Sequence, residues 1–116
     1  MIEHLTLESF KEKIMNFEEN KEWKFEGELP AIVKYSASWC SPCKALTPIL
    51  ESLSKEYDGK LNIYEVDVDS EPELSSIFNI RSVPTMLFIP MIGEPKLNIG
   101  ALPQPRLRAA IEDILT

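Results

Sequence analysis

The chain has 116 residues, which is enough for one domain with a hydrophobic core of ordinary size. Its apolar content of 44% is normal for a globular chain, and its formal charge of −7 argues against nucleic acid or an anionic membrane as a partner. No apolar run reaches the ~18 residues of a membrane-spanning helix, and the start Met1-Ile2-Glu3-His4 lacks the features of a signal peptide. We therefore expect a single domain, residues 1–116, in the cytoplasm and without a membrane partner.

The hydrophobic pattern predicts strands and helices that alternate along the chain. The expected strands are Ile2–Thr6, Pro30–Ala37, Leu61–Val68, Thr85–Ile89 and Lys96–Ile99. The expected helices are residues 7–16, Pro42–Tyr57, Pro72–Phe78 and Gln104–Leu115. A strand that follows another through a helix lies parallel to it, whereas the last two strands form a hairpin. This order predicts an α/β domain with a mixed sheet and helices on both faces.

The charged segment from Asn16 to Glu28 is predicted to be a long connection with two aromatic residues, Trp23 and Phe25, embedded in it. Two interpretations stay open for these aromatics. They either pin the connection to the body of the domain or form a surface patch for a partner.

The two cysteines, Cys40 and Cys43, stand two residues apart between an apolar strand and a helix. This spacing is typical of a dithiol/disulfide redox pair. The free N–H groups and the positive dipole end of the helix favour a thiolate on the first cysteine, and the second is close enough to attack a mixed disulfide formed by the first. Pro42 suits the first helical turn, and Trp39 can shield the pair and offer a partner a flat apolar contact.

A metal site is the main alternative for these residues, and the sequence argues against it. A zinc site at the two cysteines needs more ligands than His4, which we expect at the surface. The acidic stretch Asp67-x-Asp69-x-Glu71 resembles the start of a calcium loop, but Pro72 stands where such a loop needs glycine. We therefore expect a solvated acidic strand end and no metal.

Three segments resemble the thioredoxin family, in the expected order and over nearly the whole chain. Trp39-Cys40-Ser41-Pro42-Cys43-Lys44 resembles the family's active site, with Ser41 where the family usually has glycine. Ser82-Val83-Pro84-Thr85 resembles its cis-proline segment, and Gly100-Ala101-Leu102 resembles the glycine turn before its last helix. The resemblance implies the thioredoxin fold, with a mixed central sheet flanked by helices on both faces.

The resemblance also implies an enzyme, a thiol-disulfide oxidoreductase that reduces protein disulfides. Cys40 would be the nucleophile and Cys43 the resolving thiol. The docking surface would be shaped by residues around this pair: Trp39, Ser41, Pro42, Val83, Pro84 and Gly100. Partners would be disulfide-containing client proteins and a separate reductase as electron donor, with no bound cofactor and with the protein as a monomer.

Three alternatives stay open at this point. The redox direction can differ, because the potential depends on how far the fold stabilises the thiolate, so a thiol oxidase or isomerase of the same fold is possible. A non-catalytic binding module is the other functional alternative. A trans Pro84 would merely start the strand at Thr85, whereas a cis Pro84 would present the Val83 backbone to an extended client segment.

One departure from the family concerns two charged residues beneath the site. Lys34 stands six residues before Cys40, where the family usually has a buried aspartate credited with handling the proton of the second cysteine. Glu65 stands on the next parallel strand, where the family usually has lysine. Strand alternation points both side chains inward, so we expect a partly buried ion pair below Cys43. Glu65 would then take the proton role and Lys34 would favour the thiolate, unless the pair is only structural or Lys34 extends to solvent.

Overall fold

A mixed five-stranded sheet lies at the centre of the computed structural model, which describes residues 2–116. In chain order, the elements are β1 Glu3–His4, α1 Leu7–Lys13, β2 Ala31–Ser36, α2 Ser41–Glu56, β3 Asn62–Asp67, α3 Pro72–Ile77, β4 Thr85–Ile89, β5 Lys96–Ile99 and α4 Gln104–Leu115. The strand order is β1-β3-β2-β4-β5. β1, β3 and β2 are parallel, while β4 and β5 run antiparallel to their neighbours.

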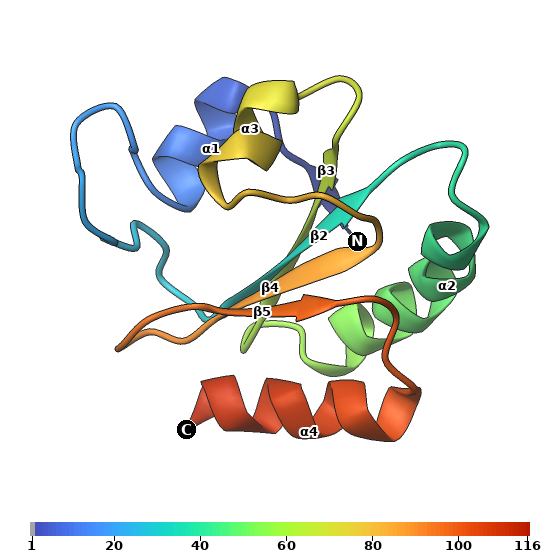
Figure 1. Ribbon diagram of the computed structural model, residues 1–116. Coiled ribbons are helices and arrows are strands. Elements are labelled where there is room, and N and C mark those ends of the chain that lie inside the picture. Colours follow the sequence, from blue (N-terminus) through green and yellow to red (C-terminus); the bar gives the residue numbers. More distant parts are fainter. Residues whose placement is uncertain (1) are drawn as a thin grey trace.

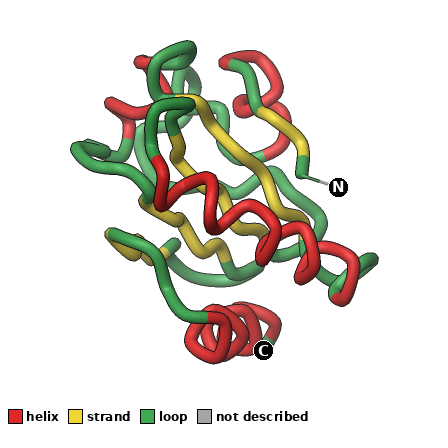
Figure 2. The backbone as a smooth tube through the Cα atoms, turned by 90° about the vertical axis from the view of Figure 1, so that its right-hand side faces the viewer, coloured by secondary structure: helices red, strands yellow, loops and turns green. Residues whose placement is uncertain are grey.

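Helices cover both faces of this sheet, with α1 and α3 on one side and α2 and α4 on the other (Figure 1). Figure 2 shows α2 crossing the sheet, with α4 seen end-on below it. The predicted α/β architecture with a mixed sheet is therefore confirmed. None of the helices within residues 2–116 combines the length and the apolar character needed to cross a bilayer.

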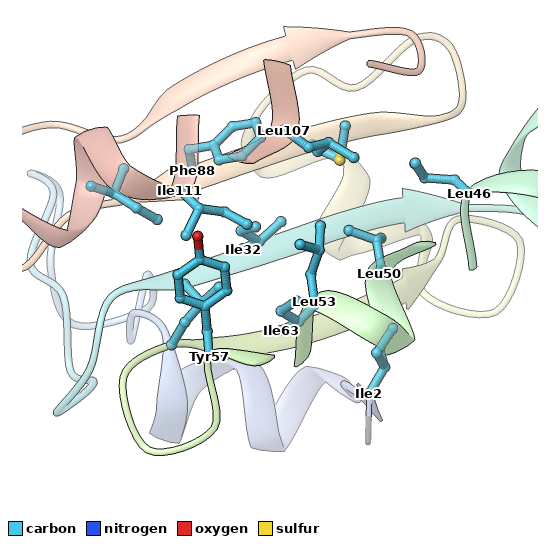
Figure 3. Packing of buried hydrophobic residues seen from close by; sticks show 13 residues of the cluster. Ile2, Ile32, Leu46, Leu50, Leu53, Tyr57, Ile63, Phe88, Leu107 and Ile111 are labelled. Atoms are coloured by element: carbon cyan, nitrogen blue, oxygen red, sulfur yellow. The ribbon is translucent and has the colours of Figure 1, made fainter. Parts of the chain in front are cut away.

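The core on the α2 and α4 side holds the active-site helix in place. Ile32, Ile63 and Phe88 of the sheet meet Leu50 of α2 and Leu107 of α4 in one buried cluster (Figure 3). Burying side chains of this size contributes ~1.5–3 kcal/mol each. The N-terminal turn of α2 is thus fixed against the sheet, and the cysteines are fixed with it.

The first helix is shorter than the sequence predicts. It begins with a capping box, in which the Ser9 N–H donates to Thr6 Oγ1 and the Thr6 N–H donates to Ser9 Oγ. It ends at Lys13 rather than at residue 16. Asn16 starts a turn of its own, because its side-chain oxygen accepts the N–H of Glu18, and a side chain that bonds the local backbone competes with helix.

The long connection between α1 and β2 is pinned by its two aromatic residues. The rings of Trp23 and Phe25 stack with centroids 6.1 Å apart and planes 10° apart. Trp23 also meets Phe78, just after α3, edge to face at 6.1 Å. Both connection aromatics are partly buried against the cluster on the α1 and α3 side, which favours the pinning interpretation over a free surface patch.

Tyr35, in the buried cluster on the α1 and α3 side, carries a hydroxyl in an apolar environment. It lies fully buried on β2, and its hydroxyl has no hydrogen-bond partner among the described residues. Burial raises the pKa of the Tyr35 phenol well above its ordinary value. An unpaired buried hydroxyl costs ~1–3 kcal/mol, so this residue stabilises the core through its ring alone.

We predict that Tyr35→Phe is at least as stable as the wild type at neutral pH, by up to ~1 kcal/mol, because the ring stays and the unpaired hydroxyl goes. The raised pKa also predicts the direction in which the stability of the fold changes at alkaline pH. The unfolded chain loses the phenol proton near pH ~10 while the folded chain keeps it, so this group's contribution to stability falls as the pH rises above ~10. The variant should therefore lose stability less steeply there.

Urea unfolding from neutral to alkaline pH measures both effects. Tyr57→Phe is the matched control, because the Tyr57 hydroxyl donates to Glu112 Oε2 at 2.7 Å and its loss should destabilise the fold. A Tyr35→Phe variant that is less stable than the wild type by as much as this control would contradict the account.

Candidate active site

The two cysteines form a disulfide at the start of α2. Cys40 is the N-cap residue of the helix and Cys43 lies in its first turn, with the Cα atoms 5.3 Å apart. In this oxidised form both residues are buried, with Cys40 4% exposed and Cys43 1% exposed.

The backbone around the pair favours negative charge on the Cys40 sulfur. This sulfur accepts the N–H of Cys43 at 3.2 Å, in place of the hydroxyl or carboxylate that usually caps a helix. The free N–H groups of the first turn and the helix dipole act in the same direction. Reduction would thus leave a sulfur that the helix start stabilises as a thiolate.

An apolar surface with one fixed aromatic surrounds the pair. Trp39 is 69% exposed, and its indole N–H donates to Asp69 Oδ2 at 2.9 Å, so the ring is held in place although it faces solvent. Val83 packs against the small buried cluster of Ala37, Cys40 and Cys43. Ser41 and Pro42 are exposed in the first turn of α2.

The loop before β4 and the end of β5 meet next to this surface. The Val83–Pro84 peptide bond is cis, and Pro84 is buried. The Gly100 N–H donates to the Pro84 carbonyl at 2.8 Å. Gly100 has a φ of +92°, a conformation in which glycine is at ease and other residues are strained. Gly100 is thus bonded to Pro84, and Pro84 directly follows Val83, which packs against the two cysteines.

The predicted ion pair beneath the cysteines is present. Lys34 Nζ lies 3.2 Å from Glu65 Oε1, and the register places Lys34 of β2 opposite Glu65 of β3. The Lys34 side chain is 1% exposed and does not extend to solvent, whereas the Glu65 side chain is 16% exposed. The alternative in which Lys34 snorkels to the surface is wrong.

Two further acceptors complete the environment of the ammonium group. Lys34 Nζ donates to the Cys43 carbonyl at 2.8 Å and to Thr47 Oγ1 at 2.8 Å. The Thr47 hydroxyl in turn donates to the same Cys43 carbonyl at 3.2 Å. An ammonium group has three N–H donors, so these three partners satisfy it completely and keep a buried positive charge directly below Cys43.

Sequence reasoning missed three partners of the site. Thr47 lies one helical turn after Cys43 and therefore on the same side of α2, a spacing that could have identified it. Asp69 was predicted only as part of a solvated acidic stretch, yet it fixes Trp39. His4 was predicted as a plain surface residue, yet its Nε2 lies 3.7 Å from Glu65 Oε2.

The carboxylates of the acidic stretch accept hydrogen bonds from backbone N–H groups. Asp67 Oδ1 accepts the N–H groups of Asp69 and Ser70, and Glu71 Oε1 accepts the N–H of Leu7. Among residues 2–116 there is no group of acidic, histidine or cysteine side chains arranged to hold a metal ion.

Comparisons with known proteins agree on one family. The family model described as Thioredoxin matches residues 1–113. A protein named Thioredoxin from Borreliella burgdorferi is 44% identical over 109 residues, which cover 94% of this chain and 93% of that protein. The protein named "Thioredoxin M-type, chloroplastic" from Spinacia oleracea is 40% identical over 96 residues, covering 83% of this chain and 53% of the relative.

A solved structure shows the same architecture. It is described as "Crystal structure of chloroplastic thioredoxin z defines a novel type-specific target recognition" and superposes with a TM-score of 0.81 at 27% sequence identity. The match covers 97% of this chain and 93% of that one. The fold that the sequence predicts is therefore confirmed.

Proposed function

Because this chain belongs to the thioredoxin family and reduces protein disulfides with its Cys-x-x-Cys pair, we propose a role for each residue around that pair. Cys40 is the nucleophile, Cys43 is the resolving thiol, and Glu65 receives the proton of Cys43. The observation that carries this assignment is the position of Cys40 at the helix N-cap, with Cys43 three residues later in the first turn.

The reaction passes two electrons from the reduced protein to its client. The Cys40 thiolate attacks one sulfur of the client disulfide, forms a mixed disulfide and releases the other client sulfur as a thiolate, which takes up a proton. Cys43 then loses its proton and attacks the Cys40 sulfur. This second step releases the remaining client thiol and leaves Cys40 and Cys43 joined, so the client is reduced and the protein is oxidised.

The docking surface supports recognition of an extended client segment. Trp39, next to Cys40, exposes apolar area, and Val83 packs against the cysteines. A client strand can add its backbone to that of Val83, while its side chains contact Trp39 and the backbone at Gly100. Such contacts favour an apolar client loop and leave its sequence largely unrestricted.

The charged pair beneath the cysteines supports the second step. Lys34 holds a positive charge next to the Cys43 carbonyl, and a nearby cation favours ionised sulfur. Glu65 is the carboxylate that pairs with Lys34, and its side chain reaches partly to solvent. It takes the proton of Cys43 when the thiol attacks.

Thioredoxins in general act on disulfide-containing targets and receive electrons from a separate reductase. We extend this to the present chain and place it in the cytoplasm. A chain whose two cysteines both belong to the redox motif is typical of a reducing compartment.

Substitution of each cysteine tests the role assignment. We predict that Cys40→Ser abolishes disulfide reduction, because the nucleophile is gone. Cys43→Ser should still attack a client disulfide and accumulate the mixed disulfide, because nothing resolves it. Mass spectrometry of the reaction mixture distinguishes the two, with reduced wild type as the control. Accumulation of a stable mixed disulfide on Cys43 in Cys40→Ser, and none in Cys43→Ser, would reverse the assignment.

Substitution of the carboxylate tests the proton role separately. We predict that Glu65→Gln slows the resolving step by ~10²-fold at neutral pH and removes the part of its pH dependence that reports a carboxylate. Single-turnover release of the second client thiol measures this step. Glu112→Gln, which changes a hydrogen-bonded carboxylate on α4, is the control. An unchanged pH profile in a folded Glu65→Gln variant would leave this carboxylate with no part in the reaction.

A further inference from the structure

His4 is the one histidine of the sequence. It lies at the end of a series of charged contacts that starts at Lys34, below Cys43, and passes through Glu65. It belongs to the edge strand β1 and is in register with Glu65 of the neighbouring β3. Its Nε2 lies 3.7 Å from Glu65 Oε2, and its side chain is 68% exposed. The imidazole therefore contacts a largely buried carboxylate on one side and bulk water on the other.

The two oxygens of Glu65 have different partners. Oε1 faces Lys34 Nζ at 3.2 Å, and Oε2 faces His4. Exposure of the three side chains increases in steps from 1% at Lys34 through 16% at Glu65 to 68% at His4. Glu65 thus bridges a fully buried ammonium group and an imidazole that reaches solvent.

Apart from Glu65, no charged group within residues 2–116 forms an ion pair with His4. Its neighbour Glu3 points to the opposite side of the strand, where Lys13 of α1 pairs with it. On α2, the Thr47 hydroxyl accepts a hydrogen bond from Lys34. Glu51 lies one turn further along the same side of that helix and is half-buried. Glu65 is the carboxylate for which the structure records an ionic contact with the imidazole.

We propose that His4 is the positioning residue through which Glu65 exchanges its proton with solvent, a role that rests on the proposed function of Glu65. When Cys43 attacks the mixed disulfide, its thiol proton passes to Glu65 and the carboxylate becomes a carboxylic acid. That proton then passes to His4 Nε2, and the imidazolium releases it to water. Glu65 returns to the carboxylate form, and neutral imidazole is ready for the next turnover.

The geometry and the chemistry of the imidazole both support this step. A distance of 3.7 Å is within reach of an ion pair but longer than a hydrogen bond, so transfer follows a small approach of an exposed side chain that is free to move. Histidine is the side chain best suited to accept and release protons near neutral pH. Protonated imidazole cannot accept a further proton, so the step requires the neutral form of the side chain.

The test is the pH dependence of the resolving step in His4→Gln, which keeps a polar side chain and cannot titrate. We expect a loss on the order of 10-fold at neutral pH, smaller than the ~10²-fold or more for loss of a direct proton acceptor. The part of the pH dependence that an imidazole causes should disappear. Imidazole added to the buffer at constant pH and ionic strength should restore the rate, because a small base can replace the missing side chain.

Two comparisons separate this proposal from simpler explanations. Glu3→Gln alters the neighbouring residue of β1 and its ion pair, and it should leave the rate and the rescue experiment at wild-type values. The double variant His4→Gln/Glu65→Gln should be no slower than Glu65→Gln alone, since His4 acts only through Glu65.

Each outcome decides between the proposals. If Glu65→Gln alters the pH profile while His4→Gln matches the wild type, the His4 role is wrong and the role of Glu65 stands. If His4→Gln is slow and added imidazole fails to restore it, His4 acts through structure and the proton role is overturned. If neither variant alters the profile, the proposed function of Glu65 fails first and the His4 role fails with it.

Discussion

A positive charge buried in a protein interior is stable only where acceptors surround it, and Lys34 is such a charge. Removing an ammonium group from water costs several kcal/mol, which the fold offsets with three acceptors placed around Nζ. These acceptors are Glu65 of β3, Thr47 of α2 and the backbone carbonyl of Cys43 itself. One side chain thereby joins two parallel strands to the first turns of the active-site helix. The position of the cysteines relative to the sheet depends on this junction.

The same arrangement explains how an ion pair without net charge can still favour one ionisation state of the thiols. Lys34 is hydrogen-bonded to the residue that carries the resolving thiol, whereas Glu65 lies beyond it, toward the edge strand β1. The nearer charge dominates in a region shielded from water, because Coulomb energy falls with distance and is weakly screened there. The N-terminus of α2 adds a field of the same sign as Lys34. Both fields favour ionised, reduced sulfur, as the role proposed for Lys34 requires.

Much of this arrangement is predictable from the sequence, because it follows from periodicity and spacing. Strand alternation pointed Lys34 and Glu65 to the same side of neighbouring parallel strands, and the structure places them in register. The cysteine spacing and the strand-to-helix junction located the redox pair. The early end of the first helix was harder to predict, because it depends on a turn in which the Asn16 side chain bonds the local backbone. The contact between His4 and Glu65 depends on a two-residue strand at the sheet edge, and so short a strand has no periodicity to show its register.

The most direct test of the account is the reduction potential of the pair after the two charges exchange places. The variant Lys34→Glu/Glu65→Lys keeps the net charge and an opposite-charge pair, but it puts the carboxylate where the ammonium group now contacts Cys43. Titration against a glutathione redox buffer measures the potential of this variant and of the wild type. We predict a more negative potential in the exchanged variant, because its reduced thiolate loses the nearby cation. An unchanged or less negative potential in the folded variant would contradict a controlling role for the buried lysine.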